Sequence, residues 1–379
     1  MPNRLPTTQP AQAAWVAGLL CWYRLHRRDM PWRRTADPYR VWVSEIMLQQ
    51  TRVETVIPYY RLFLRRFPTV RALAAADEQA VLKTWEGLGY YRRARHLHAA
   101  AGEVVQRLGG RVPLRAADLL VLPGIGEYTA AAIASICGGE AVPVLDGNVA
   151  RVMARFLCLH TDVATAAVRN AMREFLAANI SHAHPGDFNQ AMMELGAMIC
   201  KPGAPDCGAC PLRGDCQGLA QGVAADLPVR VKQRAIPRLT VGTGLLIRRN
   251  RVLLVQREAD KLLGGLWELP GGRREGRERL ADTVCRTVLR DTGIPVRALR
   301  KLCAVSHAYS HFSITLHAFL CETAGAKAAR GQQRAVWVPL DDLSRHPCGR
   351  ATLRVLEAAR TVRNEKGEPG FRGKTRKRR

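Results

Sequence analysis

Four cysteines near the middle of the chain are the clearest candidates for chemistry. Cys200, Cys207, Cys210 and Cys216 follow the pattern C-x6-C-x2-C-x5-C. Thiolates this close together usually bind one metal centre, and either a structural zinc ion or an iron-sulfur cluster would suit them. The other cysteines are scattered singly, which is typical of small buried residues. The sequence therefore predicts one metal-binding loop over residues 200–216.

Two carboxyl groups lie in contrasting environments. Glu45 is the single acid in the apolar segment 41–50, where desolvation is expected to raise its pKa and keep it protonated. Asp146 precedes a predicted helix, whose N–H groups and dipole favour the ionised form. Carboxyl groups with separated pKa values are what glycosidic cleavage requires. From the residues alone, a plain helix cap at Asp146 and a solvent-facing Glu45 remain open.

A glycine-containing turn separates two apolar helical segments within residues 119–136. The turn reads Pro-Gly-Ile-Gly, and Gly124 and Gly126 would let the backbone approach a phosphate closely. The N–H groups that open the next helix would point at that phosphate. The pattern predicts a helix-hairpin-helix motif that binds DNA, with an ordinary corner between two helices as the alternative.

The spacing of apolar residues divides the chain into two domains. Residues 1–222 show helical spacing, which predicts an all-α domain. Residues 223–238 form a basic, proline-containing linker. In residues 239–360 a strand hairpin, a helix ending at Gly293 and a half-buried strand predict an α+β fold. Residues 361–379 are polar and basic, and we expect them to be disordered.

The composition indicates a nucleic-acid partner. The chain has 58 Lys and Arg residues against 32 Asp and Glu residues, a formal net charge of +26, which fits a phosphate-rich ligand. No apolar run approaches the roughly 20 residues of a membrane-spanning helix. We expect a monomer that binds double-stranded DNA and no membrane. The N-terminus shows no secretory signal, so we expect a bacterial cytoplasmic protein at the nucleoid, or a nuclear one in a eukaryote.

Several motifs together resemble the MutY family of adenine DNA glycosylases, in the endonuclease III superfamily. The matching segments are residues 41–52, 87–91, 144–149 and 188–193. The resemblance implies a multidomain protein with an all-α helix-hairpin-helix glycosylase domain, an iron-sulfur cluster loop and an α+β Nudix-like domain. It also favours one four-iron four-sulfur (4Fe-4S) cluster per chain over zinc in the cysteine loop.

The resemblance implies roles for the two carboxyl groups and their neighbours. Glu45 would protonate N7 of adenine, and Asp146 would stabilise the positively charged sugar as the base departs. Tyr128 and Asn148 would support this catalytic site through hydrogen bonds. Strand-cleaving members of the superfamily carry a lysine where this chain has Tyr128. A phenol cannot form the required imine, so the residue predicts a glycosylase that leaves the strand intact.

Base removal requires the nucleotide to leave the stack, so other residues must fill the gap and hold the flipped base. By resemblance, the gap-filling residues are Gln50, Leu88 and Tyr90. The residues that resemble the adenine pocket wall are Met30, Trp32 and Arg33. For the Pro-Trp pair in that segment, a place in the hydrophobic core is an equal alternative.

The second domain resembles a Nudix hydrolase without its metal site. Residues 263–272 look like the entry to a Nudix box, but Thr287, Arg290 and Asp291 stand where magnesium-binding glutamates are expected. Mg²⁺ needs carboxylate oxygens, so an arginine opposes its binding. The segment 306–312 resembles the family's 8-oxoguanine recognition loop. The contacts implied there are Tyr309, Ser310 and His311.

The expected function is base excision repair, by hydrolysis of the N-glycosidic bond of adenine opposite 8-oxoguanine or guanine. One alternative is an endonuclease III-like pyrimidine glycosylase with lyase activity, against which Tyr128 argues. The other is a non-catalytic lesion-binding protein, against which intact Glu45 and Asp146 argue.

Overall fold

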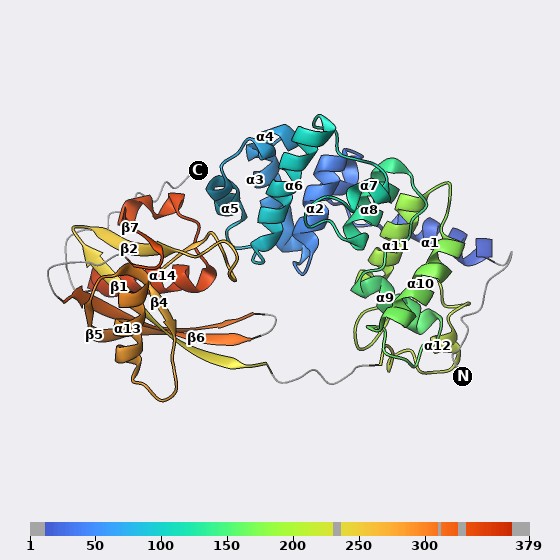
Figure 1. The fold of residues 1–379 in the computed structure, drawn as a ribbon. Helices are drawn as coiled ribbons and strands as arrows, with labels where there is room; N and C mark the ends of the chain where they lie inside the picture. Colours follow the sequence, from blue (N-terminus) through green and yellow to red (C-terminus); the bar gives the residue numbers. More distant parts are fainter. Residues whose placement is uncertain (1–11, 230–235, 310–311, 325–330, 366–379) are drawn as a thin grey trace. The chain divides into compact units, whose positions relative to one another are not determined.

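The structure is a computed structural model, shown in Figure 1. It describes residues 12–229, 236–309, 312–324 and 331–365. The chain forms two compact units, and one of them is discontinuous in sequence. Unit 1 comprises Met1–Ala75 and His96–Gln233, and unit 2 comprises Ala76–Arg95 and Arg234–Arg379. The segment Ala76–Arg95 therefore belongs with the C-terminal part of the chain, although the helical pattern continues across it.

Unit 1 is built of helices, as the apolar spacing predicts. Its helices are α1 (Gln12–His26), η1 (Pro31–Arg34), α2 (Pro38–Leu48), α3 (Val53–Arg66), α4 (Val70–Ala74), most of α6 (Arg92–Leu108), α7 (Ala116–Leu119), α8 (Glu127–Gly138), α9 (Gly147–Phe156), α10 (Ala166–Asn179), α11 (Pro185–Met198) and α12 (Gln217–Ala220). No helix of the described residues is long and apolar enough to cross a membrane.

An aromatic cluster fixes the helices that carry the candidate site. Trp15 on α1 lies 5.2 Å from Phe156 on α9 and 6.0 Å from Phe188 on α11, measured between ring centroids. Tilted aromatic pairs at such distances add to the stabilisation from burial. α11 packs against α1, α8 and α9, and α8 packs in turn against α2. These contacts bring together the parts of α2, α8 and α9 that hold the candidate catalytic residues.

Unit 2 contains one mixed sheet and its covering helices. Its elements are α5 (Glu78–Trp85), β1 (Arg238–Arg248), β2 (Arg251–Gln256), β3 (Trp267–Glu268), β4 (Gly271–Arg273), α13 (Leu280–Thr292), β5 (Val296–Ala308), β6 (Ser313–Thr323), β7 (Arg334–Pro339), η2 (Leu340–Arg345) and α14 (Arg350–Glu365). The sheet order is β3-β2-β1-β6-β5, with β4 also paired to β1 and β7 to β2. β1 and β6 are parallel, and the other pairs are antiparallel.

The two faces of the sheet are covered by different helices, which confirms the α+β prediction. Leu245 on β1 packs in the cluster that contains Val355 of α14, whereas its neighbour Leu246 packs with Val284 of α13. Adjacent strand residues point to opposite faces, so α13 and α14 lie on opposite sides. α14 continues to Glu365, beyond the predicted domain end at residue 360, and residues 366–379 lie outside the described residues.

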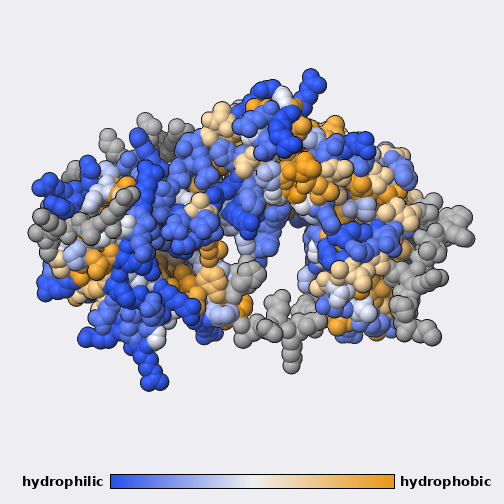
Figure 2. Space-filling model, in the orientation of Figure 1, coloured by the Kyte–Doolittle hydropathy of each residue, from blue (hydrophilic) through white to orange (hydrophobic). Residues whose placement is uncertain are grey.

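Local signals in this domain behave as predicted. Arg249 and Asn250 both have positive φ (48° and 60°) and connect β1 to β2, as a two-residue hairpin turn requires. Gly293 ends α13 in the left-handed conformation, and its N–H binds the Leu289 carbonyl. Figure 2 shows that hydrophilic side chains cover much of the visible face of both units, in keeping with the highly charged composition.

Candidate active site

Glu45 lies inside unit 1 on a helix that is buried on almost all sides. Asp37 caps α2 by accepting hydrogen bonds from the N–H groups of Tyr39 and Arg40, at 2.8 and 3.1 Å. Glu45 lies eight residues after this cap, about two helical turns along α2, among buried residues, and it is only 5% exposed. Burial raises the pKa of Glu45 to about 7, and the nearby charge of Asp146 adds to the rise. The shift has the direction that the apolar sequence predicts.

Tyr128 is the partner of Glu45. It is the second residue of α8, and its hydroxyl donates a hydrogen bond of 2.6 Å to Glu45 Oε2. Burial raises the pKa of Tyr128 well above its ordinary value, and the adjacent carboxyl group raises it further. The phenol therefore stays neutral, and its bond to Glu45 partly offsets the effect of desolvation on the pKa of that acid.

Asp146 occupies the N-cap of α9. Its Oδ1 accepts a hydrogen bond of 2.7 Å from Val149 N–H, and its Oδ2 accepts one of 3.1 Å from Asn148 Nδ2. These donors favour the ionised form, as the sequence predicts. Burial nevertheless outweighs them and raises the pKa of Asp146 above its ordinary value. Burial raises the pKa of both carboxyl groups. They differ in the number of hydrogen-bond donors that counteract this rise, which is larger for Asp146 than for Glu45.

Glu194 is a buried acid that the sequence reasoning missed. It lies on α11, and its carboxylate accepts bidentate hydrogen bonds from Arg28 (3.0 and 2.7 Å) and Arg33 (2.9 and 3.0 Å). Burial alone would raise the pKa of Glu194, but the two arginines lower it to about 2. The available signal was an acid in the apolar second half of the helix, directly after the motif at residues 188–193.

The predicted adenine-pocket residues divide between site and core. Arg33 is fixed by Glu194, and its charge lowers the pKa of Glu45, so it faces the candidate site. Met30 and Trp32 are buried, and Trp32 contacts the Tyr60 ring edge-on at 5.4 Å between centroids. Trp32 is therefore packed in the hydrophobic core, as the alternative to a place in the adenine pocket wall predicts.

The predicted hairpin joins α7 to α8. Gly124 has φ +75°, and an added Cβ would lie 2.4 Å from His96 Cβ, so the turn itself requires glycine there. Gly126 has ordinary φ, and an added Cβ would meet nothing within 4 Å. Its open surroundings leave room for a phosphate beside the first N–H groups of α8.

The four predicted cysteines line one cavity beside α12. Arg155 is 2% exposed, lines the same cavity, and donates from Nη1 to Cys200 Sγ at 3.3 Å. Among the described residues there is no group of three or more His, Cys, Asp or Glu placed to hold a single metal ion. A set made only of thiols around one cavity, with a buried cation at its wall, suits an anionic sulfur-ligated centre.

Arg151 on α9 connects the cysteine loop to the carboxyl pair. Its Nε donates to the Cys200 carbonyl at 2.8 Å, and its Nη2 donates to the Gly196 carbonyl at 2.7 Å. The same Nη2 lies 2.8 Å from Asn148 Oδ1. Asn148 in turn donates to Asp146. A continuous series of hydrogen bonds therefore runs from the loop to the catalytic candidate.

The three predicted gap-filling residues lie in two separate turns. Gln50 is exposed, has φ +56° and follows α2 in unit 1. Leu88 and Tyr90 lie in the segment of unit 2 that follows α5; Leu88 is 6% exposed and Tyr90 is 45% exposed. Of these two side chains, Tyr90 is the one accessible to a ligand in this conformation.

The predicted recognition loop follows β5. The Tyr309 ring stacks on Phe312 at 4.8 Å and meets His307 edge-on at 4.6 Å, both between centroids. Ser310 and His311 lie outside the described residues. The described part of the loop thus presents a half-buried aromatic group at the end of a strand.

Arginine-carboxylate pairs occupy the segment of unit 2 for which the sequence predicts the loss of a magnesium site. Arg290 binds Asp291 at 2.6 Å, and Arg286 binds Glu278 at 2.6 Å. Thr287 is buried and donates to the Thr283 carbonyl at 2.7 Å. Each of these carboxylates is already neutralised by an arginine, which opposes cation binding.

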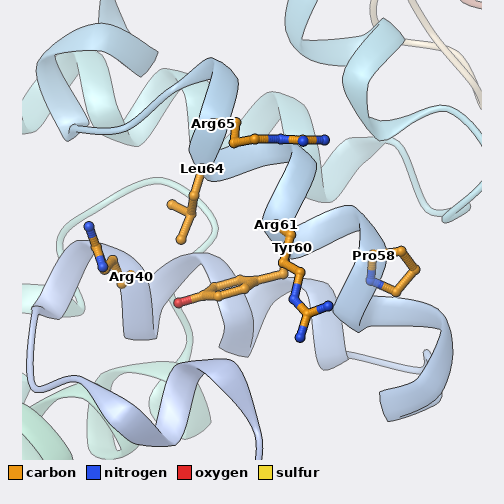
Figure 3. A pocket seen from close by; sticks show the side chains of 6 residues that line it. All are labelled: Arg40, Pro58, Tyr60, Arg61, Leu64 and Arg65. Atoms are coloured by element: carbon orange, nitrogen blue, oxygen red, sulfur yellow. The ribbon is translucent and has the colours of Figure 1, made fainter. Parts of the chain in front are cut away.

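A basic groove of about 650 Å³ lies elsewhere on unit 1, between α2 and α3 (Figure 3). It is lined by Arg40, Pro58, Tyr60, Arg61, Leu64 and Arg65. Arg40 lies on the same helix as Glu45, but five residues correspond to a rotation of roughly 140°. Arg40 is exposed and Glu45 is buried, so the groove is separate from the candidate active site.

Comparisons with known proteins match both parts of the chain. Residues 43–178 match the HhH-GPD superfamily of base excision DNA repair proteins, and residues 242–358 match the NUDIX domain. A thermostable thymine-DNA glycosylase structure is 28% identical, with a TM-score of 0.52 over 55% of this chain and 97% of that one.

Curated relatives cover more of the chain. An adenine DNA glycosylase of Homo sapiens is 36% identical over 86% of this chain and 69% of the relative. One from Mycolicibacterium smegmatis is 41% identical over 57% of this chain and 73% of the relative. Because both relatives are more than 30% identical and are matched over more than two thirds of their length, the chain belongs to the family of adenine DNA glycosylases.

Proposed function

We propose that this protein removes adenine from duplex DNA where the base is mispaired with 8-oxoguanine or guanine, as a step of base excision repair. The observation that carries the proposal is Glu45, a buried acid with a pKa near 7 that is hydrogen-bonded to Tyr128. Such an acid is protonated in a useful fraction at neutral pH and can still release its proton. Family membership gives the reaction class, and the carboxyl pair supplies the groups for it.

Glu45 donates its proton to N7 of the flipped adenine, which makes the base a neutral leaving group. The bond between adenine N9 and sugar C1′ then breaks, and the electron pair goes to the base. Asp146, held by Val149 and Asn148, stabilises the cationic sugar. Water adds to C1′ and releases a proton, which passes through solvent to the Glu45 carboxylate and restores the acid, so the products are adenine and an abasic site.

Tyr128 supports the proposal that the strand stays intact. Strand cleavage by this superfamily's chemistry needs an amine that forms an imine with the sugar. The Tyr128 hydroxyl instead binds Glu45. We therefore propose hydrolysis alone, which leaves an abasic site that breaks only on treatment with alkali.

The cysteine loop is proposed to hold one 4Fe-4S cluster through Cys200, Cys207, Cys210 and Cys216. Support comes from the single cavity that they line and from Arg155 at its wall. The cluster would be a structural centre that fixes the loop. Arg155 also donates to the carbonyls of Leu227 and Lys201, both at 2.8 Å, so the chain itself holds the loop around the site.

Recognition of the opposite base is assigned to unit 2, through Tyr309, Ser310 and His311. Support comes from the Nudix-like match together with the arginine-neutralised carboxylates, which leave a nucleotide-binding type of fold without its metal site. We further propose that the protein acts as a monomer, at the bacterial nucleoid or in a eukaryotic nucleus.

The decisive experiment compares labelled duplexes that contain A:8-oxoG, A:G, A:T or thymine glycol, each with and without alkali. We expect adenine release from A:8-oxoG and A:G, and breaks only after alkali. A break made directly by the pure protein would overturn hydrolysis alone. Cleavage at thymine glycol would favour the pyrimidine glycosylase alternative, and binding without base release would favour the lesion-binding protein.

A further inference from the structure

The segment Ala76–Arg95 is held by the Nudix-like part of the chain. It groups with Arg234–Arg379 in unit 2, and α5 packs against η2. The surface that receives it is formed by Gly265, Trp267 and Cys348, and we call these three residues the socket. They are connected to one another, since Trp267 pairs with Cys348 in a short bridge.

Gln79 joins α5 to the socket by two hydrogen bonds. Its Nε2 donates to the Gly265 carbonyl at 3.0 Å, and its Oε1 accepts from Trp267 Nε1 at 3.0 Å. Gly265 has φ +79°, and an added Cβ would lie 3.3 Å from Glu78 Oε1, so a glycine permits this close approach. Trp267 is 5% exposed, so its N–H depends on Gln79 for a partner.

The loop after α5 is fixed to the socket at both ends. Glu86 Oε1 accepts a hydrogen bond of 2.8 Å from Cys348 N–H. Tyr91 Oη donates to the Cys348 carbonyl at 3.2 Å and accepts from Gly87 N–H at 3.2 Å. These anchors bracket residues 87–90, which include both proposed gap-filling side chains of this unit. Of the three loop residues with positive φ, two are glycines, so Tyr90 (φ 48°) is the one whose conformation must be held by its neighbours. The Gly89 carbonyl also accepts hydrogen bonds from Trp85 Nε1 at 3.1 Å and Arg93 Nη2 at 3.2 Å, so the socket anchors supplement contacts within the segment.

The socket is bonded to an arginine whose charge acts on the proposed reader, because Gly265 N–H donates to the Arg257 carbonyl at 3.0 Å. Trp267 precedes Glu268, whose two carboxylate oxygens each lie 2.9 Å from Arg257 Nη1. The charges of Arg257 and Glu268 both act on the Tyr309 hydroxyl, so this ion pair lies near the reader. The backbone bond between Gly265 and Arg257 and the ion pair of Arg257 with Glu268 therefore connect the socket to the charges that surround Tyr309, and Gln79 connects the socket to α5.

We propose that the socket couples recognition of the opposite base to insertion of the loop 87–90 into the gap. Gln79 and Glu86 are then positioning residues that determine how well the protein distinguishes 8-oxoguanine from guanine. Contact of Tyr309 with 8-oxoguanine would then fix where the loop 87–90 enters the duplex. The inference rests on the reader and gap-filling roles given under the proposed function. It adds that discrimination between 8-oxoguanine and guanine requires the anchors on Gly265, Trp267 and Cys348.

The test uses the full chain with its metal centre and measures single-turnover adenine release from A:8-oxoG and A:G duplexes. Gln79→Ala and Glu86→Ala should each lower the ratio of the two rates about threefold to tenfold, as expected for the loss of one or two hydrogen bonds. Glu86→Gln keeps the acceptor for Cys348 N–H and should restore most of the ratio. Glu103→Ala removes an exposed α6 carboxylate paired with Arg107 and is the matched control.

A second arm tests whether the residues act as one unit. If Gln79 acts through the indole N–H of Trp267, the two substitutions should not be additive. The double variant Gln79→Ala with Trp267→Phe should then have the same ratio of A:8-oxoG to A:G rates as whichever single variant has the lower ratio. Thermal unfolding of every variant separates lost stability from lost discrimination. Wild-type ratios in both alanine variants, or an equal loss on both duplexes, would overturn the inference.

The wild-type arms report separately on the proposed function. If the wild-type protein releases no adenine, or releases it equally from both duplexes, the proposed activity or reader role fails and the inference fails with it. If the wild-type protein discriminates and the Gln79 and Glu86 variants discriminate equally well, only the inference fails.

Discussion

Tyr128 Oη and Glu45 Oε2 lie 2.6 Å apart, and this hydrogen bond connects the first turn of α8 to the middle of α2. It favours the ionised form of Glu45 and so opposes the effect of burial on its pKa. The proposed general acid is therefore adjusted by the phenol of Tyr128.

The first prediction concerns the pH dependence of this pair. Glu45 acts when protonated, so the excision rate should fall as pH rises through its pKa of about 7. Tyr128→Phe removes the hydrogen bond, raises the pKa of Glu45 and should move this fall to higher pH by about one unit. Single-turnover rates between pH 5 and 9 measure the shift. A fall at unchanged pH would show that another group controls it.

The second prediction is that Glu45→Gln gains stability while losing activity. Proton donation by a positioned acid contributes about 10²- to 10⁴-fold, so excision should fall by that factor while duplex binding remains. The pKa of Glu45 rises from 4.5 to about 7 on folding. Its ionisation therefore costs stability as pH rises from 4.5 to 7, by up to about 3 kcal/mol.

The stability part of this prediction is checked by urea unfolding. Glu45→Gln should be more stable than wild type at pH 8, and the difference should disappear near pH 4.5. Glu103→Gln serves as a control on an exposed carboxylate. Equal stability of Glu45→Gln and wild type at pH 8 would contradict the prediction that ionisation of buried Glu45 lowers the stability of the fold.

The third prediction concerns Glu194, whose pKa has the opposite shift. Arg28 and Arg33 overcome desolvation and lower its pKa from 4.5 to about 2. Ionised Glu194 therefore contributes about 3 kcal/mol to the free energy of unfolding. This contribution is complete above pH 4.5 and is lost as pH falls toward 2. Glu194→Gln should lose a similar amount at pH 7, because the arginines keep their charge without a buried partner. The variant's free energy of unfolding should then vary less than that of wild type between pH 4.5 and 2.

Features that depend on neighbouring residues could be predicted from the sequence. The cap at Asp146, the left-handed end of α13 at Gly293 and the hairpin turn at residues 249–250 each follow from residue type at one position. The burial of Glu45 follows from the apolar segment around it. Such signals are local, so no knowledge of the tertiary partner is needed.

Features that depend on distant partners could not be predicted. Periodicity shows that α5 has a buried face, but it does not show that Gln79 binds Gly265, 186 residues later in the chain. The same is true of Glu194, whose arginines lie more than 160 residues away. Without those partners, the acid reads only as an isolated charge in an apolar helix.

The fourth prediction concerns Arg151, which joins the cysteine loop to the active site. Arg151→Met keeps an unbranched apolar stem but removes the bonds to Asn148, Gly196 and Cys200. Asn148 then loses its orientation toward Asp146, and we expect adenine release to fall about tenfold while duplex binding changes little. The control is Arg173→Met on α10. A rate equal to wild type, with iron content unchanged, would show that Asp146 needs no support from the loop.

The last prediction separates structural from metal-binding carboxylates in the Nudix-like helix. Asp291 has a side chain only 1% exposed and accepts from Arg290 and from Gly271 N–H, which lies in β4. Asp291→Ala should therefore destabilise unit 2 by about 1 to 3 kcal/mol. The Glu278 side chain is 21% exposed and contacts Arg286, so Glu278→Ala should destabilise the unit less than Asp291→Ala.

A metal site would behave in the opposite way. Two carboxylates that shared a cation would both alter a magnesium-dependent property when removed. Unfolding of wild type and both variants with and without Mg²⁺ distinguishes the two cases. Because Arg286 and Arg290 already neutralise these acids, we expect no stabilisation by Mg²⁺ in any of them. A magnesium-dependent rise in the wild-type unfolding temperature, lost in both variants, would restore the hydrolase interpretation.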